Sequence, residues 1–300
     1  MEPTKLMPVL PLLLVLCVVA RAEENKLPEI LIEGEGWQAV YEGDAKSFTD
    51  GSCCDAEGNV YFSDMTKGVI FKIDAATGKA EPFVEVAKVS GMKWAPDGRL
   101  ICCQNGAKKI IAIDKEKKTT VLAENVGCND LIVSKKGIIY FTETGKGQVS
   151  VIDAKNQLSV GAKDLGRPNG ISLSPDQKSL AVSDYGGVNV FTLKIADDGT
   201  LSDKAAPMTM QTPPPAEGKK PVSGGDGMTT DASGRYFVTS NLGVQVFDPS
   251  GKLMGIIERP QNKGAVNLAF GGPDLSMLFI CNSDKVYKRK TKTKGIVFYK

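Results

Sequence analysis

The sequence predicts an all-β fold, a six-bladed β-propeller built from four-stranded antiparallel blades. One observation is internal repetition: a turn followed by two apolar strands recurs six times, about 40 residues apart, and that spacing is typical of a propeller blade. A second is that the apolar segments alternate with polar residues as strands do. No helical 3.6-residue period persists beyond the first 22 residues, so we expect no helices between the strands.

One residue in each hairpin turn anchors each repeat. The anchors are Gly58, Gly98, Gly137, Gln177, Gly234 and Leu275. The intervals between them are 40, 39, 40, 57 and 41 residues, and only the fourth departs, because it contains an insertion at 212–225. A stiff run of prolines between flexible glycines favours a lid beside the site, with a solvated surface loop as the alternative.

The first residues are not expected to belong to the fold. Residues 1–22 combine a positively charged start, an apolar run too short to span a bilayer comfortably, and the small-residue sequence Ala20-Arg21-Ala22. This pattern is typical of a secretory signal peptide. We therefore expect a secreted or periplasmic protein with no membrane contact after cleavage. An uncleaved anchor or a lipid attachment is the alternative.

The remaining chain is expected to form one domain. We expect residues 23–36 to form a poorly packed N-terminal extension and residues 37–300 to form the propeller. The segment Trp37–Tyr41 precedes the first repeat, so it can add a strand to the last blade and close the ring. No linker divides the repeats, and we expect a monomer.

Composition excludes several kinds of chemistry. The balance of 37 basic and 35 acidic residues argues against nucleic-acid binding. Histidine is absent, which excludes a Ser-His-Asp triad, a Cys-His dyad and His-ligated zinc. Six cysteines remain after signal cleavage, and secretion permits disulfides. Their pairing cannot be deduced from the sequence, and we expect mainly buried thiols that pack as small apolar groups.

Equivalent positions in the six repeats carry a ring of polar side chains. Eight residues before each anchor stand Asp50, Ser90, Asn129, Asn169, Asp226 and Asn267. These positions begin the first strand of each repeat, which lines the central channel of a propeller. Converging carboxylate and amide oxygens suit a hard cation, Ca²⁺ above all, with Mg²⁺, Zn²⁺ or Mn²⁺ as possible substitutes.

A second polar ring stands six or seven residues after the anchors. Its members are Asp64, Gln104, Glu143, Asp184, Asn241 and Asn282. Antiparallel pairing places both rings on one face of the disc. The first five members are candidates for the wall of a substrate pocket. The alternative is that polar residues simply occupy strand ends beside solvent.

Four segments resemble one known family. They are GCNDLIVSKKGIIYFTE (127–143), RPNGISLSPDQKSLAVSD (167–184), GGDGMTTDASGRYFVTSNLGVQVFDPSGKLMG (224–255) and NLAFGGPDLSMLFI (267–280). They are similar to the gluconolactonase, senescence-marker-protein and luciferin-regenerating-enzyme family. The resemblance implies a six-bladed propeller that holds a catalytic divalent cation, usually calcium. By the same resemblance its ligands would be Asp50, Asn129, Asn169 and Asp226.

The resemblance also implies a reaction, the hydrolysis of a sugar lactone or a related ester. Asp226 would be the general base for water, with a role as nucleophile as the secondary alternative. Two departures from the family pattern put the substrate in doubt. Asp50 stands where the family commonly has Glu, and Gln104-Asn105 stand where bacterial members often have Glu-His.

Two other functions remain open at this stage. The same metal site could act on a different substrate, such as a phosphotriester or an unrelated ester. Alternatively, the chain could be a non-catalytic secreted propeller that binds a sugar or a protein partner. The absence of the family's Glu and His at positions 104 and 105 favours this interpretation. Calcium-dependent turnover of a lactone would separate these interpretations.

Overall fold

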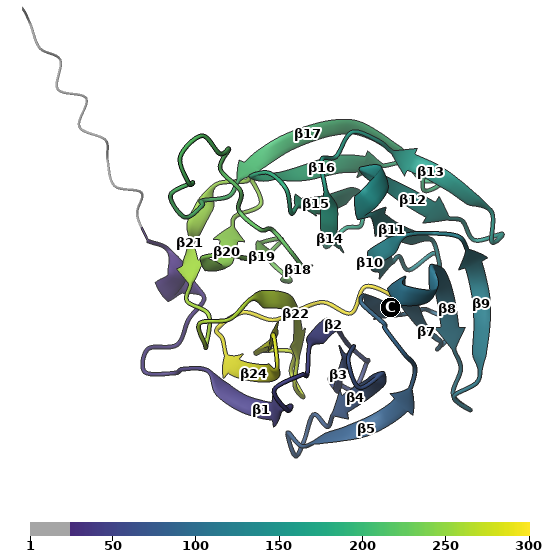
Figure 1. The fold of residues 1–300 in the computed structure, drawn as a ribbon, viewed down its shortest axis with the longest axis horizontal. Coiled ribbons are helices and arrows are strands. Elements are labelled where there is room, and N and C mark those ends of the chain that lie inside the picture. Colours follow the sequence, from purple (N-terminus) through teal and green to yellow (C-terminus); the bar gives the residue numbers. More distant parts are fainter. Residues whose placement is uncertain (1–24) are drawn as a thin grey trace, which may run out of the picture.

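Six four-stranded antiparallel sheets surround one axis and form a disc (Figure 1). This arrangement, seen in a computed structural model that describes residues 25–300, confirms the predicted six-bladed propeller. The predicted signal peptide at 1–22 lies outside the described residues. Within residues 25–300, no helix has the length and apolar character needed to cross a membrane.

Five blades are continuous in the chain, each running from its inner to its outer strand. The first blade contains β2 (Thr49–Cys54), β3 (Val60–Asp64), β4 (Val69–Ile73) and β5 (Ala80–Glu85), and the second contains β6 (Met92–Trp94), β7 (Leu100–Gln104), β8 (Lys109–Ile113) and β9 (Thr119–Glu124). The third contains β10 (Cys128–Val133), β11 (Ile139–Glu143), β12 (Gln148–Ile152) and β13 (Leu158–Ala162), and the fourth contains β14 (Pro168–Leu173), β15 (Ser179–Asp184), β16 (Asn189–Ile195) and β17 (Leu201–Thr209). The fifth contains β18 (Met228–Thr230), β19 (Tyr236–Ser240), β20 (Gly243–Phe247) and β21 (Leu253–Ile257). Short 3₁₀ helices are η1 (Leu27–Glu29), η2 (Asn105–Ala107) and η3 (Thr144–Lys146).

The sixth blade joins the two ends of the chain. It contains β22 (Ala265–Gly271), β23 (Met277–Asn282), β24 (Lys285–Lys290) and, as its outer strand, β1 (Gln38–Glu42). β1 pairs antiparallel with β24, and Lys285 Nζ lies 2.8 Å from Glu42 Oε2. The prediction that residues near Trp37–Tyr41 close the ring is therefore confirmed.

All six predicted turn anchors adopt a left-handed backbone. Their φ angles are 84°, 81°, 77°, 59°, 80° and 60° in chain order. Glycine takes this conformation freely and occupies four of the turns. Gln177 and Leu275 adopt it as well, and both bond to the C-terminal segment. Gln177 Nε2 donates to the carbonyl of Phe298 (2.6 Å), and the Gly295 N–H donates to the carbonyl of Leu275 (2.9 Å).

Neighbouring blades are joined by one side chain at the same point of each repeat. Ser63, Thr142, Ser183 and Thr239 donate their hydroxyls to carbonyl groups of the next blade's inner segment. Cys281 occupies the equivalent place in the last blade, with Sγ 3.8 Å from the Asp50 carbonyl. In the second blade the position is Cys103, which forms a disulfide with Cys128 of the third. Cys103 and Cys128 thus depart from the expected thiols, whereas the other four cysteines of residues 25–300 are free and three of them are buried, as expected.

The N-terminal extension is better packed than the sequence predicted. Leu27 is 8 % exposed and Ile30 is fully buried, in an apolar cluster with Phe237 and Met254. The Lys26 N–H also donates to the Met254 carbonyl (2.9 Å). The expectation of poor packing is wrong for this segment, because its two apolar side chains fall on the side that faces the fifth blade.

Candidate functional site

The first ring lies where the inner strands are irregular. Register shifts occur beside Asp50 in β2, within residues 128–131 of β10, within 168–171 of β14 and before Asn267 in β22. Such bulges bend a strand and redirect side chains, and they are frequent next to active sites. They allow the polar residue at the start of these four inner strands to be presented to the channel.

Glycine after a ring residue brings neighbouring inner strands close together. A Cβ at Gly170 would collide with the carbonyl of Asp226, and one at Gly51 would collide with the carbonyl of Ser90. Only glycine fits such an approach without movement of the backbone. The close approach crowds the ring side chains at the mouth of the channel.

Three buried side chains meet at the centre of this ring. Asn267 Nδ2 lies 3.5 Å from Asp50 Oδ1 and 3.5 Å from Asp130 Oδ2. Burial raises the pKa of Asp50 to about 7, and the charge of Asp130 adds to the rise. Burial also raises the pKa of Asp130, while the charge of Lys93 lowers it. Two acidic groups are therefore held together where water solvates them poorly.

Asp226 and Asn169 extend this acidic group. Burial raises the pKa of Asp226 well above its usual range, and the charges of Asp50 and Asp130 raise it further. A hydrogen bond from Asn169 has the opposite, smaller effect. The Asn169 side chain is 6 % exposed, and its Oδ1 has no hydrogen-bond partner among the described residues. An unpartnered buried oxygen is uncommon, and a bound ion or an ordered water would satisfy it.

The fourth predicted ligand, Asn129, lies nearer the surface. It is half-buried in β10 and shares with Asn169 the wall of a cavity of about 410 Å³. Ser90, from the same ring, does not offer its hydroxyl to the channel. Its Oγ donates to the backbone carbonyl of Asn129 at 2.6 Å, and so fixes the start of β10.

These residues fit a hard cation. Carboxylate and amide oxygens are the ligands that Ca²⁺ prefers, and a divalent ion would neutralise acids whose pKa values are raised by burial and mutual repulsion. The free Asn169 Oδ1 is the observation that tests the fit directly. In residues 25–300, no three His, Cys, Asp or Glu side chains form a metal cluster. The amides are therefore needed to complete any ligand set.

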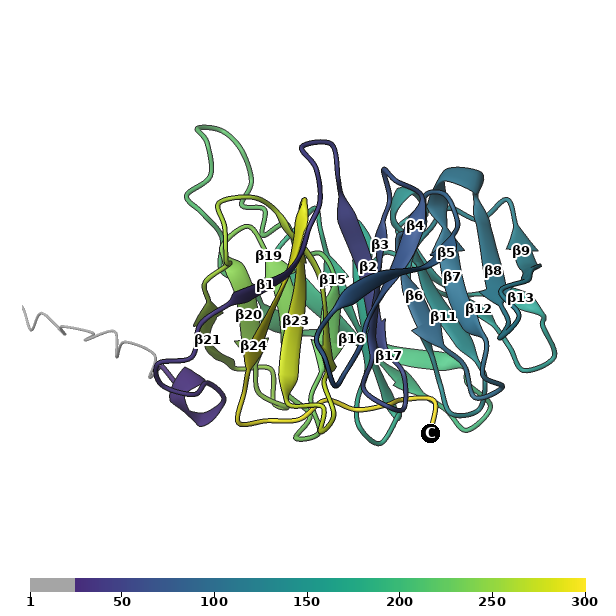
Figure 2. The same cartoon turned by 90° about the horizontal axis from the view of Figure 1, so that it is seen from below.

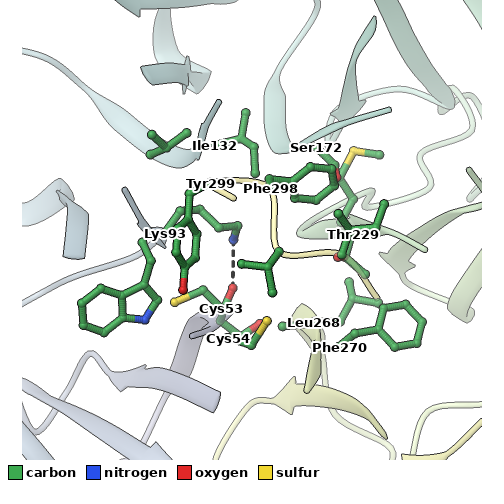
Figure 3. A pocket seen from close by; sticks show the side chains of 17 residues that line it. Cys53, Cys54, Lys93, Ile132, Ser172, Thr229, Leu268, Phe270, Phe298 and Tyr299 are labelled. Carbon is green, nitrogen blue, oxygen red and sulfur yellow. Dashed lines mark hydrogen bonds between the residues drawn. The ribbon is translucent and has the colours of Figure 1, made fainter. Parts of the chain in front are cut away.

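Sequence reasoning missed Asp130 and Lys93. Asp130 stands directly after a ring residue, at the position that is glycine in four of the other repeats. That departure from the repeat was the available signal. Lys93 is half-buried in the channel below the ring, and its Nζ donates to the Ser52 carbonyl at 2.8 Å (Figure 3). Its charge opposes that of Asp130.

The five predicted pocket residues, Asp64, Gln104, Glu143, Asp184 and Asn241, bind nearby backbone groups. Their partners are the N–H groups of Lys67, Gly127 and Arg167 for the three carboxylates, and the carbonyls of Ala87 and Val222 for the two amides. These bonds hold the loops around the channel. A contact between these side chains and substrate stays a prediction.

Other residues line the cavity beside Asn129 and Asn169. They include the residues that directly follow three members of the second ring, Asn105, Thr144 and Tyr185, together with Arg167 and two glycines. Asn105 Nδ2 donates to the Cys128 carbonyl (2.9 Å), and Thr144 Oγ1 donates to the Pro168 carbonyl (2.6 Å). The wall is thus built from hairpin residues that follow β7, β11 and β15.

The insertion emerges on the face that carries the rings. Figure 2 shows it at the same end of the disc as the connection from β1 to β2, and Figure 1 places it toward the rim near β21. Its last part is fixed, because Ser223 donates its N–H to the Gly187 carbonyl and accepts from the Asn241 N–H, both at 2.9 Å. Whether the insertion covers the channel as a lid stays a prediction.

Comparison with known proteins identifies the family. The family described as "SMP-30/Gluconolactonase/LRE-like region" matches residues 48–284. The match covers well over half of the chain, so the chain belongs to this family, as the four sequence segments indicated.

Individual relatives are distant. The chain is 27 % identical over 230 residues to a gluconolactonase of Zymomonas mobilis, a match that covers 69 % of this chain and 64 % of that protein. It therefore spans less than two thirds of that relative's length. It is 24 % identical over 232 residues to the pentonolactonase XacC of Haloferax volcanii, covering 75 % of this chain and 77 % of the relative.

Solved structures share the fold. A gluconolactonase from Xanthomonas campestris gives a TM-score of 0.75 at 23 % identity, covering 88 % of this chain and 92 % of that one. The calcium-binding protein regucalcin from Agrobacterium tumefaciens gives 0.72 at 16 % identity, covering 88 % and 96 %. At these identities the likeness shows a common architecture.

Proposed function

We propose that this chain is a calcium-dependent lactonase that hydrolyses a sugar lactone or a related ester at the end of the channel where the first polar ring lies. The observation that carries the proposal is the unpartnered Oδ1 of Asn169 beside the half-buried Asp226. Two distant relatives are named for lactone hydrolysis, a gluconolactonase and a pentonolactonase. They support a lactone as the substrate class.

The ligands in this proposal are Asp50, Asn129, Asn169 and Asp226. The first and last carry the two negative charges that match a divalent cation. A calcium ion held by these oxygens would supply Lewis acidity toward the lactone carbonyl. Asn129 and Asn169 also line the cavity, so a substrate that fills it would contact the ligand set.

Asp226 is the residue that we propose as general base. Its carboxylate takes a proton from a water molecule while the water oxygen attacks the lactone carbonyl carbon. The ring C–O bond then breaks, and the leaving alkoxide receives that proton, which gives a hydroxy acid. Two backbone hydrogen bonds fix residue 226 in position, because its N–H donates to the Thr239 carbonyl (3.0 Å) and its carbonyl accepts from Ser183 (2.7 Å).

The test uses purified protein, without its first 22 residues, and D-glucono-1,5-lactone. Hydrolysis should be followed by acid release with excess calcium, and again after chelation and readdition. We expect turnover that disappears with the chelator and returns with calcium. No turnover above the spontaneous rate, on this lactone or on pentonolactones, would overturn the proposal and favour the non-catalytic binding protein.

We further propose that the protein is secreted or periplasmic. The Cys103–Cys128 disulfide supports this independently of residues 1–22, because disulfides persist mainly in oxidising compartments. Cell fractionation with mass spectrometry of the mature N-terminus tests the proposal. We expect a chain that begins at Glu23 outside the cytoplasm, whereas an intact N-terminus in the cytoplasm would contradict it.

A further inference from the structure

One charged side chain faces the cavity beside the predicted ligands. Arg167 precedes β14 and lies two residues before Asn169, and both line the 410 Å³ cavity. Its guanidinium stands over the Tyr185 ring, 5.1 Å from the ring centre. The Arg167 side chain also lies across Gly186, where any Cβ would collide with it. The methylene carbons of this exposed side chain therefore pack on Gly186, and the guanidinium stacks on Tyr185.

The backbone holds this pair in place. Asp184 Oδ1 accepts from the N–H groups of Arg167 (2.9 Å) and Gly186 (3.0 Å), and the Tyr185 N–H donates to the Arg167 carbonyl (3.0 Å). A second-ring carboxylate thus joins the segment before β14 to the turn after β15. Arginine and tyrosine are consequently presented to the cavity as one unit.

The guanidinium of Arg167 has no polar partner in the described part of the chain. The other four arginines there all donate side-chain hydrogen bonds: Arg99 to Asp97, Arg235 to Asp231, Arg259 to Asn262 and Arg289 to the Glu35 carbonyl. Among residues 25–300, no acidic group lies within ion-pair distance of Arg167. Its five N–H donors remain available for a ligand.

Asp184 brings a carboxylate to this region, but it accepts from backbone N–H groups and forms no ion pair with the Arg167 guanidinium. In the proposed loaded site, Asp50 and Asp226 balance a divalent cation, and Lys93 opposes Asp130. The remaining residues of the cavity wall are neutral, which leaves Arg167 as its one formal charge among the lining residues. A planar guanidinium with free donors matches a carboxylate or phosphate in a bidentate geometry.

We propose that Arg167, supported by Tyr185, is a specificity-determining residue that selects lactones carrying an acidic group outside the lactone ester, either a carboxylate or a phosphate. This inference rests on the proposed lactonase function. The site should therefore prefer anionic over neutral sugar lactones. The acidic group would bind the guanidinium, and the lactone carbonyl would lie beside the proposed calcium ligands.

The experiment compares three lactones on the calcium-loaded protein. They are neutral D-glucono-1,5-lactone, its 6-phosphate, and D-glucaro-1,4-lactone, which carries a carboxylate. We expect kcat/KM to be at least about tenfold higher for one of the anionic lactones than for the neutral one. The phosphate and carboxylate arms identify which acid the site accepts. A preference for the neutral lactone would overturn the inference and leave the lactonase proposal intact.

Variants then assign the preference to the side chain. Arg167→Gln should lower kcat/KM for the preferred anionic lactone by about 10- to 100-fold, through KM, and change the neutral lactone by about threefold at most. Arg167→Lys should recover part of the loss, because it keeps the charge without the fork. Arg99→Gln is the matched control, since it removes the same charge from a turn outside the cavity. Equal losses on all three lactones in Arg167→Gln would show a structural role.

A binding measurement separates this inference from the reaction. Calorimetry with the hydrolysis products, gluconate, 6-phosphogluconate and glucarate, requires no turnover. The diacidic products should bind more tightly than gluconate to the wild type, and this difference should shrink in Arg167→Gln. Absence of lactone turnover together with this pattern would remove the lactonase proposal and keep the anion subsite. Equal binding of all three products would remove the subsite.

Discussion

The two ends of the channel are built from the same six inner strands but have opposite character. The end that carries the two polar rings, here called the upper end, has buried acids, the unpartnered Asn169 Oδ1 and an open cavity of about 410 Å³. At the lower end, Phe298 and Tyr299 of the C-terminal segment fill the channel among apolar side chains such as Ile132 and Leu268 (Figure 3). The space that remains there is about 40 Å³, which holds little more than one or two waters.

This difference separates chemistry from stability within one set of strands. The upper end keeps charged groups that burial disfavours, which is a cost that a ligand can offset. At the lower end the C-terminal segment fills the channel, and residues 291–299 form hydrogen bonds to the turns of several blades. Substitutions at the upper end should therefore change function, and those at the lower end should change the free energy of unfolding.

The largest effect is expected for Asp226→Ala. It removes a carboxylate ligand and the proposed base, so calcium affinity and lactone turnover should both fall by at least about 100-fold. Calorimetry with calcium and the acid-release assay measure the two losses. Circular dichroism should show a folded protein, because the backbone of residue 226 keeps its bonds. Full activity in this variant would show that the mechanism is wrong.

A second prediction concerns pH and the metal-free protein. Burial raises the pKa of Asp50 to about 7 from an unfolded value of 3.8, so the folded state holds a proton that the unfolded chain releases. The contribution of Asp50 to stability is complete below pH 3.8 and is lost as the pH rises toward 7. The free energy of unfolding, measured with urea in a chelator, should therefore fall between pH 5 and 7.

Asp50→Asn is the control for this pH dependence, because it removes the titrating group and keeps the shape of the side chain. The slope between pH 5 and 7 should become smaller in this variant. Excess calcium should also reduce it in the wild type, since the bound cation favours ionised acids. An unchanged slope in Asp50→Asn would assign the pH dependence to other groups.

A substitution at the lower end should change the free energy of unfolding and leave calcium binding unchanged. Phe298 is 8 % exposed and belongs to a cluster with Leu173 and Leu180, so Phe298→Ala should lower the free energy of unfolding by about 3 kcal/mol. Calcium affinity should stay within about twofold of the wild type. Lys294→Ala is the control, because it truncates an exposed side chain of the same segment. A large change in calcium affinity with little loss of stability would show that the two ends are coupled.

The joint between the second and third blades tests what holds the ring around the site. Cys103 occupies the place of the hydroxyl residues at the other joints, and Cys128 precedes Asn129. Cys103→Ala with Cys128→Ala should cost about 3 kcal/mol of unfolding free energy, as for loops of similar length. Cys103→Thr with Cys128→Ala should cost less, because threonine restores a hydroxyl donor. Equal losses in both double variants would show that the hydroxyl is not an equivalent joint.

The sequence predicted those features that recur in every blade. The repeat and its alternating apolar residues predicted six blades and their turns, and the segment before the first repeat predicted the strand that closes the ring. The left-handed φ of Gln177 and Leu275 shows that the anchors were aligned correctly even without glycine. The first ring followed from the same alignment. Asp130 did not follow from it, because aspartate stands there in one repeat only, where four other repeats have glycine.

Features that depend on one blade or on contacts between distant segments could not be predicted. The Cys103–Cys128 pairing depends on which blades become neighbours at which height. The pairing of Arg167 with Tyr185 depends on the bulge in β14 and the turn after β15. The packing of Leu27 and Ile30 depends on where a short helix meets β21. Periodicity carries no information about such contacts, because they occur once.

The smallest effect is expected for the insertion, which lies at the upper end but outside the repeat. Pro213, Pro214 and Pro215 make its first part stiff, and Gly218 supplies a left-handed φ of 70° near its tip. It lies toward the rim in Figure 1, so a lid would have to move inward when substrate binds. Ser223 is bonded to Gly187 and Asn241, and such a motion would therefore pivot before residue 223.

Replacing residues 213–222 with a short Gly-Ser linker tests this idea and keeps the bonds of Ser223. Calcium affinity should be nearly unchanged, because no predicted ligand is removed. If the insertion closes over substrate, KM should rise about two- to tenfold and selectivity among lactones should decrease, since the shielding contacts are lost. The matched control inserts the same linker in place of the turn at 197–199 between β16 and β17. Unchanged kinetics on several lactones, with an intact fold, would show that the insertion is a surface loop.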